Sequence, residues 1–387
     1  MGYYNVKKLR KKEKRRVKTK IMEYFSIWYL LILASFSFIL FNYMYFSCRE
    51  DKLNNFFGFM TLLFVFLHII FILLLSNQEI TLQVFVIPLW ILTLGLPLVV
   101  IISLLMISTG IAVIYKRFFR TNYSKLHRKI NNNKIRSKVR EDTLRKGNHI
   151  IIFTGVLIVW YIGLLVMREL TGSSDYMLPE GSNMFLLYLR ILNEPNSIEN
   201  IIASLGWLYF ILFFFFYTLS LFIITIEFSR KSKFFSFPFN IFPKLYLSEN
   251  ERERYGTYLY FSIGQMLSAF ICPPMVFFAI LGTGSYGDLM ASQIGIRYGK
   301  KHISWNEKKT WEGTIAGIIM TFFICILFIG MIWAIIFAMI FLIVDIFTEK
   351  PINISDNLLI PIGCSLSYII IRFIFNFNYY SIILSWL

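Results

Sequence analysis

The sequence has 387 residues, of which 57% are hydrophobic, 18% aromatic and only 16% charged. Because an ordinary soluble domain is about 45–50% apolar and about 25% charged, this composition excludes a soluble globular enzyme, a disordered chain, a collagen-like chain and a disulfide-rich scaffold. Lysine and arginine number 39 against 22 acidic residues, which gives a net charge of +17. In a membrane protein this excess follows from basic cytoplasmic loops and gives no reason to expect a nucleic-acid partner, although basic loops can also hold phosphates.

The N-terminal part of the chain divides into three predicted regions. Residues 1–23 carry ten basic residues and predict a cytoplasmic tail, and residues 24–115 predict an N-terminal transmembrane bundle. The spans expected in that bundle are 24–47, 56–76 and 80–115, the last split into a tight hairpin at Gly95–Pro97. Residues 116–148 form a basic loop with twelve Lys or Arg against two acids, which belongs on the same face as the tail.

Residues 149–387 alternate between apolar runs and polar segments and predict a second transmembrane domain. The segments are a span at 149–167, an acidic outer loop at 168–200, a span at 201–226, a basic segment at 227–257, an apolar stretch at 258–285, a polar island at 286–312, an apolar stretch at 313–345, a polar segment at 346–357 and a last apolar run at 358–387. We expect the first apolar stretch to double back at Pro273-Pro274, and the second to form one tilted span or a hairpin at Gly330.

Together these segments predict an all-α polytopic transmembrane helical bundle of about 8–11 spans, counting broken and re-entrant helices. Basic residues mark the cytoplasmic side of a membrane protein. The tail and four polar segments are therefore expected to face the cytosol, the segments being 116–148, 227–257, 286–312 and 346–357.

The stretch from Gly282 to Gly317 has the composition of a phosphate site, because glycines allow close backbone approach and free N–H groups to point at an anion. If Asp288 begins a helix, three small residues follow on its face, namely Ala291, Ser292 and Gly295. Such a face leaves room for a nucleotide or a metal. A lone carboxylate beside several phosphates is a natural Mg²⁺ ligand, so Asp288 is the candidate for it.

The basic residues after this helix have two interpretations. Lys308 and Lys309 can neutralise phosphate charge, and the helix predicted after Glu312 can bind an anion at its N-terminus. Alternatively the segment is a membrane-surface loop, in which the lysines follow the positive-inside rule and Glu312 favours the helix dipole. Composition alone leaves both interpretations open.

Three separated blocks resemble the dolichol kinase family, which is grouped with phytol kinases, CTP-dependent diacylglycerol kinases and the phosphatidate cytidylyltransferases. The first block is Gly287-Asp288-x-x-Ala291-Ser292-x-x-Gly295, followed by Lys308-Lys309-Thr310-x-Glu312-Gly313. The second is Arg145-Lys146-x-x-His149 at the start of a span. The third is Glu349, followed by Asp356-Asn357-Leu358-x-x-Pro361.

The resemblance implies an integral membrane enzyme with residues 149–387 as its catalytic transmembrane domain. The implied reaction transfers the γ-phosphoryl of CTP, with Mg²⁺ as cofactor, to a lipid alcohol such as dolichol. Asp288 and Asp356 are the implied metal ligands, and Glu312, Glu349 and His149 complete the catalytic candidates, with Asp356, Glu349 or His149 as the base. The implied nucleotide and phosphate residues are Arg145, Lys146, Gly287, Ala291, Ser292, Gly295, Lys308, Lys309, Thr310, Gly313 and Asn357.

Other functions remain as alternatives. A phosphatidate-type cytidylyltransferase shares much of the first block, but its C-terminal His-Gly-Gly and paired-aspartate signature is absent here. A CTP-dependent diacylglycerol kinase would keep the mechanism and change the acceptor, whereas a transporter would need more polar residues inside the spans. The chain has no GxxxxGK[ST] loop for ATP phosphates. The expected location is the endoplasmic reticulum membrane in a eukaryote or the cell membrane in an archaeon, with the site facing the cytosol; the sequence leaves the oligomeric state open.

Overall fold

A computed structural model describes residues 52–75, 138–171, 254–348 and 350–385, together with single positions among residues 42–46, 103–117 and 212–227. The predicted tail and most of the segments expected before residue 138 and between 171 and 254 lie outside this description. Within the described residues the chain is helical apart from loops and one two-stranded sheet. The prediction of an all-α membrane helical protein is confirmed, while the number of spans stays a prediction.

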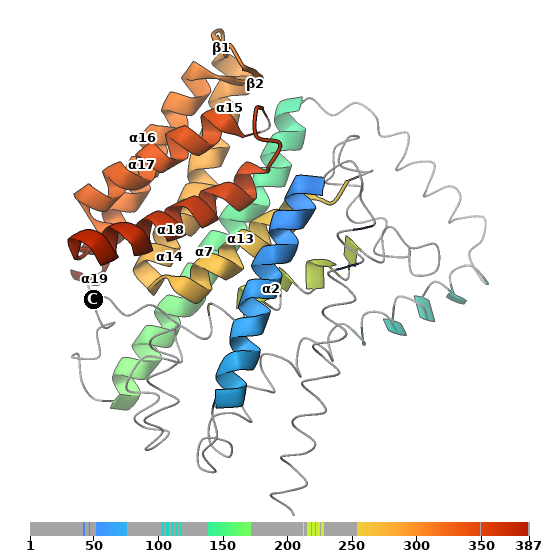
Figure 1. The fold of residues 1–387 in the computed structure, drawn as a ribbon, viewed down its shortest axis with the longest axis vertical. Helices are drawn as coiled ribbons and strands as arrows, with labels where there is room; N and C mark the ends of the chain where they lie inside the picture. The colour runs from blue at the N-terminus through green and yellow to red at the C-terminus, as the bar shows by residue number, and fades with distance from the viewer. Residues whose placement is uncertain are drawn as a thin grey trace, which may run out of the picture.

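Figure 1 shows the described elements as a bundle of helices with one small hairpin at its upper end. In chain order the elements are α2 (Lys52–Leu75), α7 (Lys138–Thr171), α13 (Thr257–Ile271), α14 (Pro274–Gly282), the π-helix η4 (Thr283–Gly287), α15 (Asp288–Tyr298), β1 (His302–Ile303), β2 (Asn306–Thr310), α16 (Trp311–Ile329), α17 (Met331–Phe347), α18 (Asp356–Phe375) and α19 (Ile382–Ser385). Helix α7 therefore begins within the predicted basic loop and continues through the predicted span.

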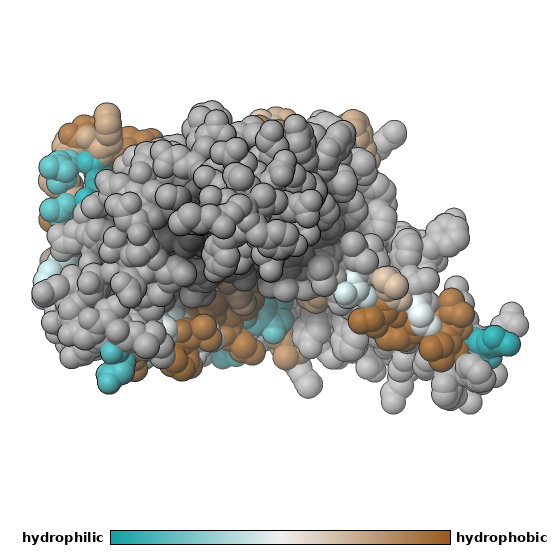
Figure 2. All heavy atoms as spheres, turned by 90° about the horizontal axis from the view of Figure 1, so that it is seen from below, coloured by the Kyte–Doolittle hydropathy of each residue, from teal (hydrophilic) through white to brown (hydrophobic). Residues whose placement is uncertain are grey.

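Three described helices are long and apolar enough to cross a membrane, and they cover Asp142–Gly163 in α7, Trp311–Ile329 in α16 and Asp356–Phe375 in α18. On α16 the side chains of Ile315, Ile319 and Phe323 recur every four residues, and each is more than half exposed. A continuous exposed apolar stripe on a helix is suited to lipid and unsuited to water. Apolar side chains of described residues also reach the surface seen from below, where they are brown in Figure 2.

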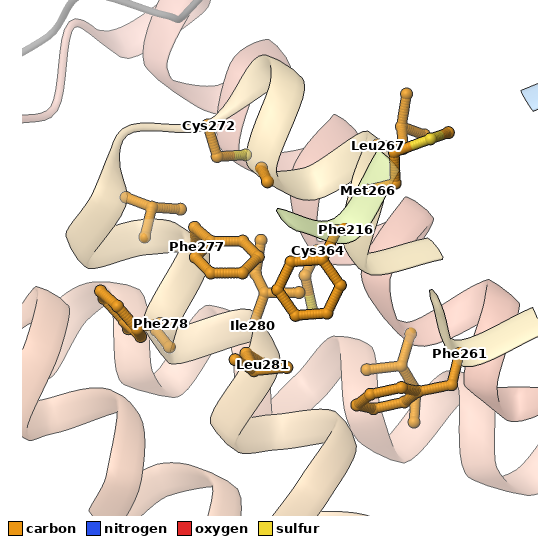
Figure 3. Packing of buried hydrophobic residues seen from close by; sticks show 14 of the residues in the cluster. Phe216, Phe261, Met266, Leu267, Cys272, Phe277, Phe278, Ile280, Leu281 and Cys364 are labelled. Carbon is orange, nitrogen blue, oxygen red and sulfur yellow. The ribbon is translucent and has the colours of Figure 1, made fainter. Parts of the chain in front are cut away.

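The two predicted interruptions of apolar stretches are both present. Cys272 and Pro273 have extended backbone between α13 and α14, and Pro274 starts α14 at a position where a helix needs no N–H donor. Figure 3 shows the chain turning at Cys272. Gly330 ends α16 and precedes α17 with a φ of +80°, a conformation that favours glycine. The break at Pro273-Pro274 and the hairpin at Gly330 are therefore confirmed.

Helix α14 is enclosed by apolar side chains, as expected for a helix that is hydrophobic on every face. Phe277, Phe278, Ile280 and Leu281 are fully buried and lie in the core drawn in Figure 3. The ring of Phe278 meets the ring of Trp160 on α7 edge-on, with centroids 5.2 Å apart. Because α14 is fixed in this way, η4 and α15, which continue directly from it, are also held in place.

Polar segments gather at one end of the described bundle. In Figure 1 the β1–β2 hairpin and the first turns of α7 lie at the upper end, and the C-terminal helices α18 and α19 end at the lower left. The side chain of Asn306 donates hydrogen bonds to the carbonyls of Ile346 and Thr348, at 3.2 and 2.6 Å, and so ties the hairpin to the end of α17. The parts of 116–148, 286–312 and 346–357 that are described thus share an end, and its cytosolic orientation stays a prediction.

Candidate active site

Two lysines and three aspartates from separate helices and one strand meet at this polar end, and we call them the charged cluster: Lys146, Asp288, Lys309, Asp345 and Asp356. Lys146 Nζ on α7 lies 2.7 Å from Asp288 Oδ1 at the start of α15 and also donates to the Asp288 backbone carbonyl at 2.9 Å. Both side chains are less than 10% exposed. A buried ion pair of this kind requires its geometry to be held by the surrounding helices.

Lys309 at the end of β2 connects the other two aspartates. Its Nζ lies 2.6 Å from Asp345 Oδ1 on α17 and 3.1 Å from Asp356 Oδ2 at the start of α18. Thr314 on α16 donates its hydroxyl to the second oxygen of Asp345 at 2.5 Å. The three sequence blocks, which are far apart in the chain, are therefore brought to one place.

The charge balance of the cluster leaves one carboxylate oxygen without a partner. Two lysines face three aspartates, and Asp288 Oδ2 is buried with no hydrogen-bond partner among the described residues. Burial raises the pKa of Asp288 above its ordinary value, against the opposing effect of Lys146. Burial lowers the pKa of Lys309, but Asp345 and Asp356 outweigh that effect, so the pKa of Lys309 stands well above its ordinary value.

The chemistry of these donors suits a Mg²⁺ ion that is shared with a ligand. Mg²⁺ is usually held by one or two protein carboxylates, several waters and the phosphates of a substrate. Among the described residues no three His, Cys, Asp or Glu side chains converge as an all-protein cage. Asp288, with its unpartnered oxygen, and Asp356, with its side chain about one-fifth exposed, are the two residues that fit the role.

Asp142 is a site residue that the motifs missed. It accepts hydrogen bonds from Ser292 at 2.5 Å and Gln293 at 3.0 Å on α15, and it pairs with Arg145 one turn along α7 at 3.0 Å. These contacts clamp α7 against α15 beside the Lys146–Asp288 pair. The structure thus places the predicted Arg145 and Ser292 next to the charged cluster, linked to each other through Asp142.

The predicted small residues lie where α15 packs on α16. A Cβ on Gly313 would lie 2.5 Å from the carbonyl oxygen of Ala291 and 3.0 Å from the Cα of Gly295. A Cβ on Gly287 would collide with Thr321 of α16. The structure accounts for these positions as close helix packing that fixes Asp288, and their contact with a nucleotide stays a prediction.

The remaining predicted residues are spread around the cluster. Both Glu312 carboxylate oxygens accept from the backbone N–H of Lys301, so Glu312 stabilises the hairpin and does not join the cluster. Thr310 accepts from the Gly313 N–H at 3.3 Å as the N-cap of α16, and Lys308 is an exposed residue of the hairpin. The Asn357 N–H donates to Asp356 Oδ1 at 2.9 Å.

His149 and Glu349 complete the predicted set. His149 is buried one turn along α7 from Lys146, and its ring stacks on Phe261 with centroids 3.8 Å apart. Its Nδ1 has no hydrogen-bond partner among the residues that the structure describes. Glu349 lies outside the described residues.

Asp345 is absent from the three motif blocks, but its place in the sequence indicates a functional residue. Asp345 follows the uncharged residues 313–344, and an ionisable side chain at the end of such a run is a functional candidate by default. Asp142, one of two acids in a strongly basic loop, gave a weaker signal. The π-helix η4 had none, although π-turns frequently mark functional sites.

Part of the chain is similar to a curated kinase. No protein-family model matches the chain, and no solved structure matches it. A phytol kinase from Synechocystis sp. (strain ATCC 27184 / PCC 6803 / Kazusa) is 28% identical over an alignment of 130 residues, which covers 30% of this chain and 54% of the relative. The match thus spans about half the length of that relative. Over this stretch the chain is similar to a phytol kinase.

Proposed function

We propose that this protein is a membrane kinase that transfers the γ-phosphoryl group of CTP to the hydroxyl of an isoprenoid alcohol. The observation that carries the proposal is the convergence of the three blocks on one largely buried charged cluster, in which one carboxylate oxygen has no hydrogen-bond partner among the described residues. The similarity to a phytol kinase supports the same reaction class. A phytol-like or a dolichol-like acceptor would use the same chemistry.

The charged cluster suits phosphoryl transfer because that reaction depends on positioning and charge neutralisation more than on covalent chemistry. Lys146 and Lys309 each bind a carboxylate, so the positions of their ammonium groups are already fixed before a nucleotide binds. Arg145, one turn from Asp142, adds a third cation at the edge of the cluster. In this proposal triphosphate oxygens replace some of the carboxylate partners of these cations.

The transfer step is a displacement at the γ-phosphorus. A bond forms between the alcohol oxygen and the γ-phosphorus, the bond from that phosphorus to the β,γ-bridging oxygen breaks, and CDP leaves. The hydroxyl proton passes to Asp356 or to His149, the two described candidates for the base. Mg²⁺, when bound through Asp288 and Asp356, would supply charge neutralisation at the phosphates.

The position of the cluster suits two substrates of opposite polarity. It lies at the polar end of the bundle, beside helices α16 and α18, which are apolar enough to span a membrane. A nucleotide can therefore reach the cluster from water, and a lipid alcohol can reach it from the bilayer. We place this end on the cytosolic side because the basic segments belong there.

The direct test is a product analysis with the purified full-length protein in lipid nanodiscs. The protein is incubated with Mg²⁺, γ-labelled CTP and, separately, phytol, geranylgeraniol, dolichol, diacylglycerol or phosphatidate. We expect labelled lipid monophosphate and CDP with an isoprenoid alcohol, and much weaker transfer from ATP. Pyrophosphate together with a CDP-lipid would replace the proposal by a cytidylyltransferase. Preference for diacylglycerol would change the acceptor alone, and no turnover with any lipid would refute the proposal.

A further inference from the structure

Helix α13 carries a buried carboxamide, that of Gln265, which makes no hydrogen bond to any described residue. Gln265 is fully buried, and neither its Nε2 nor its Oε1 has a hydrogen-bond partner among the residues that the structure describes. Leaving a buried polar group unpaired destabilises the folded state, and most buried polar side chains in proteins are satisfied. A residue of this kind is expected where a ligand supplies the missing partner.

The surroundings of Gln265 connect it to the proposed active site. A Cβ on Gly284, in η4, would lie 3.2 Å from Gln265 Nε2 and 3.6 Å from the ring of Phe261. Phe261, one turn before Gln265 on α13, stacks on His149. The Nδ1 of His149 is also buried and has no hydrogen-bond partner within the described part of the chain. The hydroxyl of Ser285 donates to the His149 carbonyl at 3.3 Å and holds η4 against α7. We call His149, Gln265 and Gly284–Ser285 the inner polar layer.

The inner polar layer lies one helical turn farther into the bundle than the charged cluster. On α7, His149 follows Lys146 by three positions, in the direction away from the polar end. On the segment formed by η4 and α15, Gly284 precedes Asp288 by four positions, again away from the polar end. Beyond the layer lies the apolar core around Ile280 and Leu281. The layer therefore separates the place for phosphates from an apolar region.

The chemistry of the layer matches an uncharged hydroxyl. A carboxamide offers both a donor and an acceptor, and so does an alcohol. Gln265 brings no charge to the layer, whereas a phosphate or a carboxylate would require cations. We propose that Gln265, beside His149, binds the hydroxyl of the lipid alcohol and presents its oxygen to the phosphates one turn away. This inference rests on the proposed function and assigns Gln265 as a residue that binds and selects the acceptor.

A binding experiment tests the inference without relying on turnover. Labelled phytol and phytol methyl ether, which keeps the chain but has no O–H donor, are bound to the protein in nanodiscs without nucleotide. The wild type should prefer the alcohol by about tenfold, the effect of one net hydrogen bond. Gln265→Met keeps a similar volume and removes both amide atoms, and it should bring the ratio of the two affinities near one. An unchanged ratio in a folded Gln265→Met protein would overturn the inference.

Ser268→Ala is the matched control on the same helix. Ser268 donates to backbone carbonyls and accepts from Ser365 at 2.9 Å, so its role lies in the packing of α13 on α18. The control should lower the melting temperature and leave the alcohol-to-ether ratio as in the wild type. Gln265→Met should melt at or above the wild-type temperature, because it removes an unsatisfied polar group. A ratio lost in both variants would mean a structural effect and would count against the inference.

Activity measurements keep this inference apart from the proposed function. In an active wild type, Gln265→Met should raise the KM for the alcohol about tenfold and leave the KM for CTP unchanged. If the wild type discriminates alcohol from ether, Gln265→Met loses that discrimination and the wild type phosphorylates no lipid, then Gln265 binds the hydroxyl and the kinase proposal falls. If it makes lipid phosphate and Gln265→Met leaves the KM for the alcohol unaltered, the kinase proposal stands and the inference falls.

Discussion

Lys146 and Asp288 are 142 positions apart in the sequence, yet their side chains meet at 2.7 Å inside the protein. Each comes from a different sequence block, and each is fixed by its own helix, α7 or α15. Asp142 clamps the same two helices through Ser292 and Gln293. The Lys146–Asp288 ion pair therefore joins the Arg145–His149 block to the block that begins at Gly287.

Breaking the pair from the lysine side should destabilise the protein strongly. Lys146→Met leaves the Asp288 carboxylate buried without a cation, and the loss of one partner of a buried ion pair costs about 3–5 kcal/mol. The free energy of unfolding in detergent measures this loss. Adding Asp288→Leu to Lys146→Met should recover most of it. Lys300→Met, at an exposed position, is the control and should change stability by about 0.5 kcal/mol or less. Equal effects of Lys146→Met and Lys300→Met would show that the pair contributes little.

Asp288→Asn tests the metal-binding role of this carboxylate. The substitution keeps the size of the side chain and removes the charge that would hold Mg²⁺. It also leaves Lys146 buried without its carboxylate, so the melting temperature should fall. We expect the protein that remains folded to lose kinase activity by orders of magnitude. Glu307→Gln, at an exposed position on β2, should keep full activity. Near-normal turnover by Asp288→Asn would remove this carboxylate from the mechanism, and loss of the folded protein would indicate a structural role.

Gly313→Ala should loosen the contact between α15 and α16. The added methyl would lie 2.5 Å from the Ala291 carbonyl oxygen, and overpacking of this kind costs about 1–3 kcal/mol. Gly155→Ala is a control that should raise the stability of the protein. A Cβ at that position meets nothing within 4 Å, and alanine is favoured over glycine in a helix interior by about 0.5–1 kcal/mol. Thermal unfolding of both variants tests the pair of expectations. A Gly313→Ala protein as stable as Gly155→Ala would contradict the packing role.

The stability supplied by Lys309 should not vary with pH near neutrality. Because its pKa in the folded protein is raised above the ordinary value of 10.5, its contribution is fully present below that value and is lost only as pH rises through the higher, folded value. The difference in unfolding free energy between wild type and Lys309→Met should therefore be constant between about pH 7 and pH 9. A difference that shrinks across this window would mean that Asp345 and Asp356 do not stabilise the charged form.

Local sequence features predicted the breaks between helices, because single residues determine the backbone conformation there. Pro273-Pro274 and Gly330 impose backbone conformations, so the breaks in the two apolar stretches could be read from single residues. The order of the three blocks also indicated Asp288, Lys146, Lys309 and Asp356 as a set. The four residues lie close together because of packing between helices, which their spacing in the sequence does not reveal. Only the family resemblance predicted that they share one site.

What the sequence left out depends on contacts between distant segments. Asp142 was hidden among basic residues, and its partners Ser292 and Gln293 come from another helix. Glu312 was expected in the site because it sits in the motif, but its carboxylate faces the Lys301 backbone across the hairpin. Gln265 is one of several polar residues in an apolar stretch, and it is distinguished only by its burial without a hydrogen-bond partner among the described residues.

The two ends of the bundle should lie on opposite sides of the membrane. Helix α16 has 19 residues and is about 28 Å long at 1.5 Å per residue, enough to separate Lys300 from the turn at Gly330 by the hydrocarbon core. Thr143, Lys300 and Lys350 are exposed at or near the polar end, and Met331 is exposed beside Gly330.

In the experiment, each of these four residues is changed singly to cysteine in a chain whose natural cysteines are replaced by serine. An impermeant thiol reagent applied to sealed right-side-out and inverted vesicles should label the first three variants from the cytosolic side and Met331→Cys from the opposite side. Labelling of Thr143→Cys and Lys300→Cys from opposite sides would separate the second block from the first and remove the shared site on which the kinase proposal depends.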